Sequence, residues 1–183
     1  MLATTPRLSL REFTANDVDS FYALESNPAN ARYQTWEPRT RQQSSKLVDE
    51  AINSILIQPR RVIELVVETG CETETPRFIG RVGCMIADNI ANLWFSFLPA
   101  AQGKGYATEA VRALITFLHD APAGNLVAFE TLQIECDPRN TGSRRIAERL
   151  GFQKISEELN VYKCKGELVG SVVYETGIQG WLK

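Results

Sequence analysis

The chain has 183 residues, enough for one sizeable domain and short for two, so we expect a single domain over residues 1–183. Hydrophobic residues make up 44% of the chain and charged residues 23%, a balance that excludes an intrinsically disordered protein. The formal net charge of −2 leaves no basic field to attract nucleic acid or an anionic membrane surface.

Metal-binding and nucleophilic side chains are few and scattered. The four cysteines show none of the Cys-x-x-Cys spacing of zinc or redox sites, and His119 is the one histidine of the chain. We therefore expect no metal, no histidine-based catalytic dyad, and the reduced thiols of an intracellular protein. The first residues lack the layout of a signal peptide, and no apolar run approaches the ~18 residues that span a bilayer. These features favour a soluble, cytoplasmic protein.

The first part of the chain predicts a strand followed by two helices. Residues 8–13 alternate apolar and polar side chains, which is typical of a half-buried strand. Capping residues at 14–17 introduce a helix over residues 18–24, which Pro28 follows closely. Apolar residues at helical spacing predict a second helix from about 41 to 58.

Three strands are expected next. Residues 62–68 and 78–86 are rich in β-branched side chains, and residues 91–98 form a third apolar run that stops at a proline. The polar segment 69–77 contains glycine and proline and predicts an exposed hairpin loop.

The last part of the chain alternates helices and strands. An apolar stripe predicts a helix from 106 to about 118, then a strand over 132–136 and a helix over 141–150. Segments 161–164 and 168–174 are typical of a closing hairpin. The order β, α, α, β, β, β, α, β, α, β, β predicts an α/β protein with a mixed sheet flanked by helices.

The segment Gln102–Ala107 carries the clearest functional signal. It lies between a predicted strand and a helix, and its glycines let the backbone approach a ligand with N–H groups turned inward. The helix N-terminus adds a positive dipole end, so the segment suits a pyrophosphate. It is not a P-loop, because Lys104 precedes Gly105 rather than serine or threonine, and Thr108 replaces the third glycine of a dinucleotide fingerprint.

The same segment resembles the signature (Gln/Arg)-x-x-Gly-x-(Gly/Ala) of the GNAT acyltransferases through Gln102, Gly105 and Ala107. Its extension to Ala110 resembles the ribosomal-protein alanine N-acetyltransferase branch, the RimJ/RimL type. Further segments that resemble this branch occur in the same order along the chain: Arg7–Phe13, Phe78–Gly83, Asn140–Ser143 and Leu150–Phe152.

The resemblance implies a fold and a co-substrate. The fold would be a mixed, mostly antiparallel central sheet flanked by helices, with a V-shaped splay between two central strands. The co-substrate would be acetyl-coenzyme A. Its pantetheine arm would contact Phe97, Leu98 and Asn140, although core packing would also account for the first two and a helix cap for Asn140. Its pyrophosphate would be held by backbone N–H groups of Gln102, Gly103, Lys104, Gly105, Tyr106 and Ala107.

The resemblance also implies a general acid. Many family members carry a tyrosine four residues before the glycine of the last motif, but this chain has Ala147 there. In the resembled branch a hydroxyl three residues after the asparagine lies near the sulfur, and Ser143 matches that position. Ser143 is equally explained as an N-terminal helix serine that bonds the backbone.

The base and the acceptor pocket are less constrained by the sequence. Glu158 follows the last motif, where the resembled branch can carry a base, although a solvated surface carboxylate explains it too. The strand carboxylates Glu64 and Glu135 are alternatives. Trp36 and Trp94 are candidates for shaping the amine pocket, and core packing would also account for them.

We therefore expect an N-acetyltransferase that moves an acetyl group to a primary amine by direct attack in a ternary complex. The branch resemblance points to a protein or peptide N-terminal α-amine, with a polyamine or an aminoglycoside-like amine as the alternative. A non-catalytic acyl-CoA-binding regulatory module is the alternative from another class. We expect neither nucleic acid nor membrane as partner, and either a monomer or a homodimer.

Overall fold

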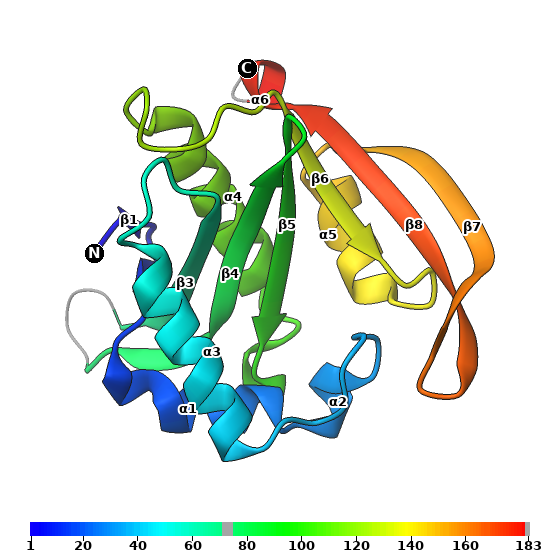
Figure 1. The fold of residues 1–183 in the computed structure, drawn as a ribbon, viewed down its shortest axis with the longest axis horizontal. Helices are drawn as coiled ribbons and strands as arrows, with labels where there is room; N and C mark the ends of the chain where they lie inside the picture. The colour runs from blue at the N-terminus through cyan, green and yellow to red at the C-terminus, as the bar shows by residue number, and fades with distance from the viewer. Residues whose placement is uncertain (71–74, 182–183) are drawn as a thin grey trace.

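A computed structural model describes residues 1–70 and 75–181, which form a mixed α/β structure around one eight-stranded sheet (Figure 1). The strand order is β1-β2-β3-β4-β5-β6-β8-β7, and every neighbouring pair except β5 and β6 is antiparallel. The strands are β1 Ala3–Thr4, β2 Leu8–Glu12, β3 Val62–Thr69, β4 Arg77–Ala87, β5 Ile90–Phe97, β6 Thr131–Cys136, β7 Gln153–Cys164 and β8 Glu167–Gly177. The predicted mixed, mostly antiparallel sheet is confirmed.

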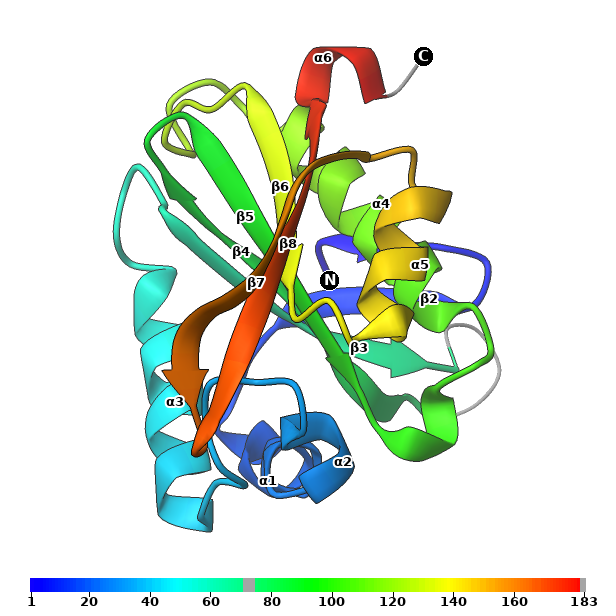
Figure 2. The same ribbon diagram turned by 90° about the vertical axis from the view of Figure 1, so that its right-hand side faces the viewer.

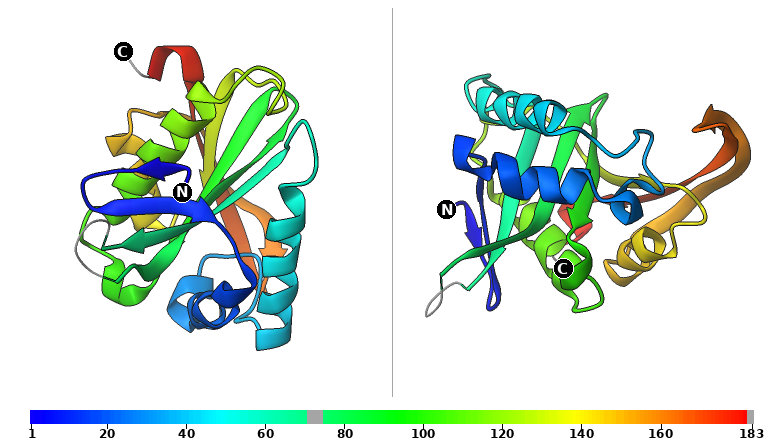
Figure 3. Two further views of the ribbon diagram at one scale, coloured as in Figure 1. Left: turned by 90° about the vertical axis from the view of Figure 1, so that its left-hand side faces the viewer. Right: turned by 90° about the horizontal axis from the view of Figure 1, so that it is seen from below.

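Helices cover both faces of this sheet, as Figures 2 and 3 show from the sides and from below. The helices are α1 Val18–Glu25, α2 Pro28–Ala31, α3 Arg41–Ser54, α4 Tyr106–Asp120, α5 Thr141–Arg149 and α6 Ile178–Trp181. Helices α4 and α5 bury their apolar stripes against one face in the larger core, whereas α1 and α3 pack on the other face around Val66. Short 3-10 turns occupy Ala15–Asp17 and Pro99–Ala101.

The sheet splays open between β5 and β6. These parallel strands pair only at their starts, where Ile90–Asn92 face Thr131–Gln133. Beyond this point, within residues 1–70 and 75–181, β5 pairs with β4 alone and β6 with β8 alone, and the two strands diverge in Figure 1. The V-shaped splay expected from the family resemblance is confirmed, and it leaves unpaired backbone along two central strands.

The closing hairpin is longer than the sequence indicated. Strand β7 begins at Gln153 rather than at 161 and runs along β8 as the edge of the sheet. Its side chains are almost all exposed, so no apolar alternation marked its first half. Helix α3 ends earlier than expected, at Ser54, and the short helix α2 was not expected.

Part of one prediction lies outside the described residues. The hairpin loop expected at 69–77 includes residues 71–74, and Cys71 is among these. In the part of the chain that the structure describes, no helix is both long enough and apolar enough to cross a membrane.

Candidate active site

A cavity of about 500 Å³ opens at the splay, where the end of β5 faces the start of α5. The residues that line it come from the end of β5, the glycine loop with the start of α4, α2 with the segment after it, and α5 with its N-cap. The structure brings most of the predicted coenzyme residues together here, with Ser143: Phe97, Gln102, Gly103, Gly105, Tyr106, Ala107 and Asn140.

The glycine loop has the backbone that its sequence anticipates. Gly103 and Gly105 have φ values of 74° and 80°, a left-handed conformation that side chains disfavour. Gly105 is the N-cap of α4, so the free N–H groups of the helix start lie at the cavity. Gln102 braces the loop, because its Nε2 donates to the Phe97 carbonyl at 2.9 Å and to Asn30 Oδ1 at 3.1 Å.

The opposite wall is the N-terminus of α5. Asn140 is its N-cap, and its Oδ1 accepts the backbone N–H of Ser143 at 3.1 Å. Asn140 and Ser143 also line the cavity, so Asn140 can cap the helix and still face a ligand in the cavity. The Ser143 hydroxyl makes no hydrogen bond with the residues that the structure describes.

Two cationic side chains in this wall were missed by the sequence analysis. Arg145 and Arg149 both line the cavity from α5. Residues four apart share a face of a helix, so their spacing beside the predicted asparagine could have revealed a basic patch. Such a patch suits the phosphate groups of a nucleotide-bearing ligand.

The remaining predicted residues lie outside this lining. Leu98 packs with the α1–α3 core and donates its N–H to Ile79, and Lys104 turns its carbonyl toward Arg7. Trp36 lies 4.7 Å from the guanidinium of Arg39. Glu158 is exposed on β7.

Trp94 and Glu64 belong to an ionic cluster beneath the α1–α3 side of the sheet. The Trp94 indole N–H donates to Glu64 Oε2 at 2.9 Å, and Arg81 donates to the same oxygen at 3.1 Å. Arg81 also contacts Glu25 at 3.2 Å, and Arg39 donates to Glu25 at 2.9 Å. Burial raises the pKa of Glu64, although the charge of Arg81 and the indole hydrogen bond oppose the shift.

This cluster depends on a missing side chain at Gly83. Glu64, Gly83 and Trp94 lie opposite one another on β3, β4 and β5. A Cβ on Gly83 would lie 2.4 Å from the Ile63 carbonyl oxygen and 2.7 Å from Trp94 Nε1. The indole therefore reaches Glu64 only because position 83 is glycine.

Two predicted carboxylates, Glu135 and Glu158, lie on one face of the strands β6, β8 and β7. Glu158 pairs with Ser171, whose hydroxyl donates to Glu135 at 2.5 Å. Glu157 pairs with the buried Val172 and so faces the other way, where it accepts from Arg144 at 3.2 Å. Of the two adjacent acids, Glu158 therefore shares a face with Glu135.

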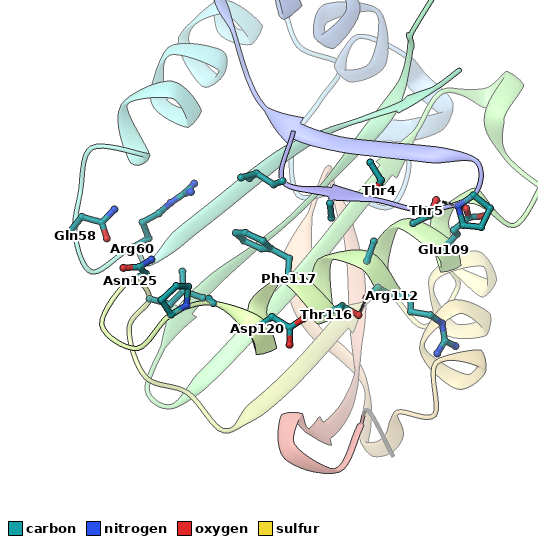
Figure 4. Close-up of a pocket in the computed structure, with 17 residues that line it drawn as sticks. Thr4, Thr5, Gln58, Arg60, Glu109, Arg112, Thr116, Phe117, Asp120 and Asn125 are labelled. Atoms are coloured by element: carbon teal, nitrogen blue, oxygen red, sulfur yellow. Dashed lines mark hydrogen bonds between the residues drawn. The ribbon is translucent and has the colours of Figure 1, made fainter. Parts of the chain in front are cut away.

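A second and larger cavity, of about 830 Å³, lies between β1 and the outer face of α4 (Figure 4). Thr5 and Glu109 stand at one end, and Gln58, Arg60 and Asn125 at the other. None of the predicted site residues lines it, and no feature of the sequence had indicated it.

Residues 7–153 match the family model described as the acetyltransferase (GNAT) domain. The uncharacterized N-acetyltransferase p20 of Bacillus licheniformis is 25% identical over 169 residues, which cover 90% of this chain and 89% of that protein.

Two solved structures show the same fold at low sequence identity. The spermidine N-acetyltransferase of Vibrio cholerae, in complex with CoA and spermine, has a TM-score of 0.80 and 17% identity, covering 98% of this chain and 100% of that one. RimL, the ribosomal L7/L12 α-N-protein acetyltransferase, in complex with coenzyme A, has a TM-score of 0.79 and 16% identity, covering 96% and 97%.

Proposed function

Because this chain belongs to the acetyltransferase (GNAT) family, we propose that it binds acetyl-CoA in the splay between β5 and β6 and acetylates a primary amine. One observation carries the proposal. The cavity at the splay is lined by left-handed Gly103 and Gly105, by the free start of α4, and by Asn140 and Ser143 of the facing helix. Backbone N–H groups at a helix start bind phosphate oxygens without a dedicated cation.

In this proposal the coenzyme lies across the loop and along β5. Backbone N–H groups from Gln102 to Ala107 hold the pyrophosphate, and Arg145 and Arg149 supply positive charge for the phosphates. The pantetheine arm extends beside Phe97 toward Asn140, replacing the strand partner that β5 lacks beyond Asn92. Residues 1–183 act together as one catalytic domain.

The transfer itself is a direct attack. The amine nitrogen bonds to the thioester carbon, the carbonyl oxygen takes the negative charge, and collapse of this intermediate breaks the C–S bond. Backbone N–H groups at the open end of β5 stabilise the oxyanion, and Ser143 supplies the proton that the leaving thiolate takes. The proton lost by the amine passes through water to Glu158.

For the acceptor we favour the α-amine of a peptide or protein. Such an amine has a pKa of about 8, against about 10.4 for a lysine side chain, so a solvated carboxylate suffices as base. Glu158 is such a group, because it is exposed on β7. The RimL structure with coenzyme A has the same fold and is named for this acceptor class.

A polyamine is the second candidate, and the carboxylates on the Glu135 face of β6, β8 and β7 favour it. Glu135 and Glu158 share that face, and Glu175 joins them through its pairing with Gln133. A row of carboxylates attracts an amine that carries more than one positive charge. The Vibrio cholerae structure holds spermine as well as CoA.

The test is isothermal titration with acetyl-CoA, followed by thiol release against an amine panel. The panel holds N-terminal peptides, spermidine, spermine and an aminoglycoside. We expect coenzyme binding and thiol release that depends on the N-terminal peptides. Thiol release with polyamines alone would refute the α-amine acceptor and support the polyamine acceptor. Binding without release from any amine would point to a regulatory module, and absence of binding would refute the coenzyme site.

A further inference from the structure

The turn before β2 holds the coenzyme loop from behind. Arg7 donates from Nη1 to the Lys104 carbonyl at 3.0 Å and from Nε to Glu109 Oε2 at 2.7 Å. Its guanidinium also lies 4.7 Å from the centre of the Tyr106 ring. Arg7 is not among the residues that line the splay cavity, so these contacts grip the outer side of the loop. One side chain thus ties the N-terminal turn to three positions of a segment about a hundred residues away in the sequence.

The bond to the Lys104 carbonyl fixes the direction of a neighbouring donor. That carbonyl and the N–H of Gly105 belong to the same peptide group, which is planar and trans, so they point in opposite directions. Gly105 lines the splay cavity and Lys104 does not. With the oxygen held on the outer side by Arg7, the Gly105 N–H is turned toward the cavity. A glycine with φ of 80° would otherwise let this peptide rotate at little cost.

Arg7 also balances a carboxylate beside the proposed pyrophosphate site. Glu109 lies in the first turn of α4, where it accepts from Arg7 and from the Thr5 hydroxyl. Burial works to raise the pKa of Glu109, but the hydrogen bonds from Thr5 and Arg7 and the charge of Arg7 outweigh it and lower that pKa. Glu109 is therefore ionised at neutral pH, and without Arg7 its charge would repel a pyrophosphate.

We propose that Arg7 is a positioning residue for the coenzyme: it orients the Gly105 N–H and neutralises Glu109 without touching the ligand. This inference rests on the proposed function, because the ligand it serves is acetyl-CoA. It adds a determinant of coenzyme affinity that lies outside the glycine loop.

The experiment compares R7M, R7K, the double variant R7M/E109Q and the control R41M. Arg41 is an exposed arginine at the start of α3, which packs on the other face of the sheet from α4, and it pairs with Asp19. Isothermal titration with CoA gives the dissociation constant, and thermal unfolding gives Tm. Loss of Arg7 should weaken CoA binding about tenfold. R7K should fall between wild type and R7M, because an ammonium replaces the charge but not the planar set of donors.

The double variant separates the two roles of Arg7. Replacing Glu109 by glutamine in the R7M background removes the unbalanced charge, so part of the lost affinity should return, while the loss from the misoriented N–H remains. Affinity for 3′-dephospho-CoA, which keeps the pyrophosphate, should fall by the same factor as affinity for CoA. A loss seen with CoA and absent with dephospho-CoA would mean that Arg7 contacts the 3′-phosphate directly, and this would overturn the positioning role.

Kinetic readouts separate positioning from general destabilisation. R7M should raise the KM for acetyl-CoA while leaving kcat at saturating acetyl-CoA and the KM for the amine unchanged. A wild-type protein that fails to bind CoA refutes the proposed function. A wild-type protein that binds CoA, with R7M binding equally well, refutes this inference alone. Should R7M fail to fold, the single variant E109Q tests the charge role. This role requires E109Q to bind CoA with an affinity equal to or above that of the wild-type protein.

Discussion

Ser143 uses its backbone, not its hydroxyl, to hold the start of α5. The Asn140 side chain accepts the Ser143 N–H, and any residue other than proline at position 143 would supply that donor. The hydroxyl therefore contributes nothing to the cap and is free to serve the leaving sulfur. A substitution that removes the Ser143 hydroxyl therefore tests the proposed acid without removing the helix cap.

We predict that S143A lowers kcat up to about tenfold with little change in the KM for acetyl-CoA, since a thiolate of pKa about 8.5 leaves without strong help. Steady-state thiol release measures both constants. S143T keeps a hydroxyl and should retain more activity than S143A. Equal kcat values for S143A and wild type would remove Ser143 from the mechanism.

Strand β4 has no side chain at position 83, and the Trp94 indole of β5 crosses this position to donate a hydrogen bond to Glu64 of β3. We predict that G83A lowers the free energy of unfolding by about 1–3 kcal/mol, because the added methyl group overlaps the Trp94 ring and the Ile63 carbonyl. Denaturant unfolding followed by tryptophan fluorescence measures the change.

Gly177 provides the matched control for this substitution. A Cβ there meets no atom within 4 Å, and its φ is not positive. G177A should therefore change the free energy of unfolding by less than about 0.5 kcal/mol. If G83A proved as stable as G177A, the close packing of the indole over position 83 would be disproved.

Elements with a strong apolar pattern were predictable, and elements without one were not. Helix α4 carries a continuous buried stripe, and β3 is rich in buried β-branched residues, so both were located within a residue or two of their observed ends. The first half of β7 is an exposed edge strand outside the core. It therefore has no buried face, and its sequence shows no apolar alternation. Its existence depends on hydrogen bonds to β8 rather than on side-chain burial.

The candidate site divides along the same line. The glycine loop could be predicted because its function requires specific residues at fixed local spacing. The bonds from Arg7 to Lys104 and Glu109 could not, because they join residues about a hundred positions apart through tertiary packing. The indole bond from Trp94 to Glu64 was missed for the same reason.

At the scale of the whole molecule, the sheet consists of two blocks with a narrow junction. Strands β1 to β5 form one block and β6 to β8 the other, and Ile90–Asn92 with Thr131–Gln133 supply the strand pairing between them. Side chains of α4 and α5 pack in a core common to both blocks. The pairing across the splay is thus much weaker than the pairing within either block.

The splay has a consequence for how the protein survives in a cell. A molecule that lies in the gap and bonds both blocks binds the folded state alone, so coenzyme should slow amide hydrogen exchange in residues 93–97 and 134–136 together. Mass spectrometry with and without CoA measures this exchange, with α3 as an internal control whose exchange should stay constant; protection on one side of the splay only would contradict the prediction.

Resistance to proteases would then depend on the supply of coenzyme, and a cell short of acetyl-CoA would degrade this protein faster.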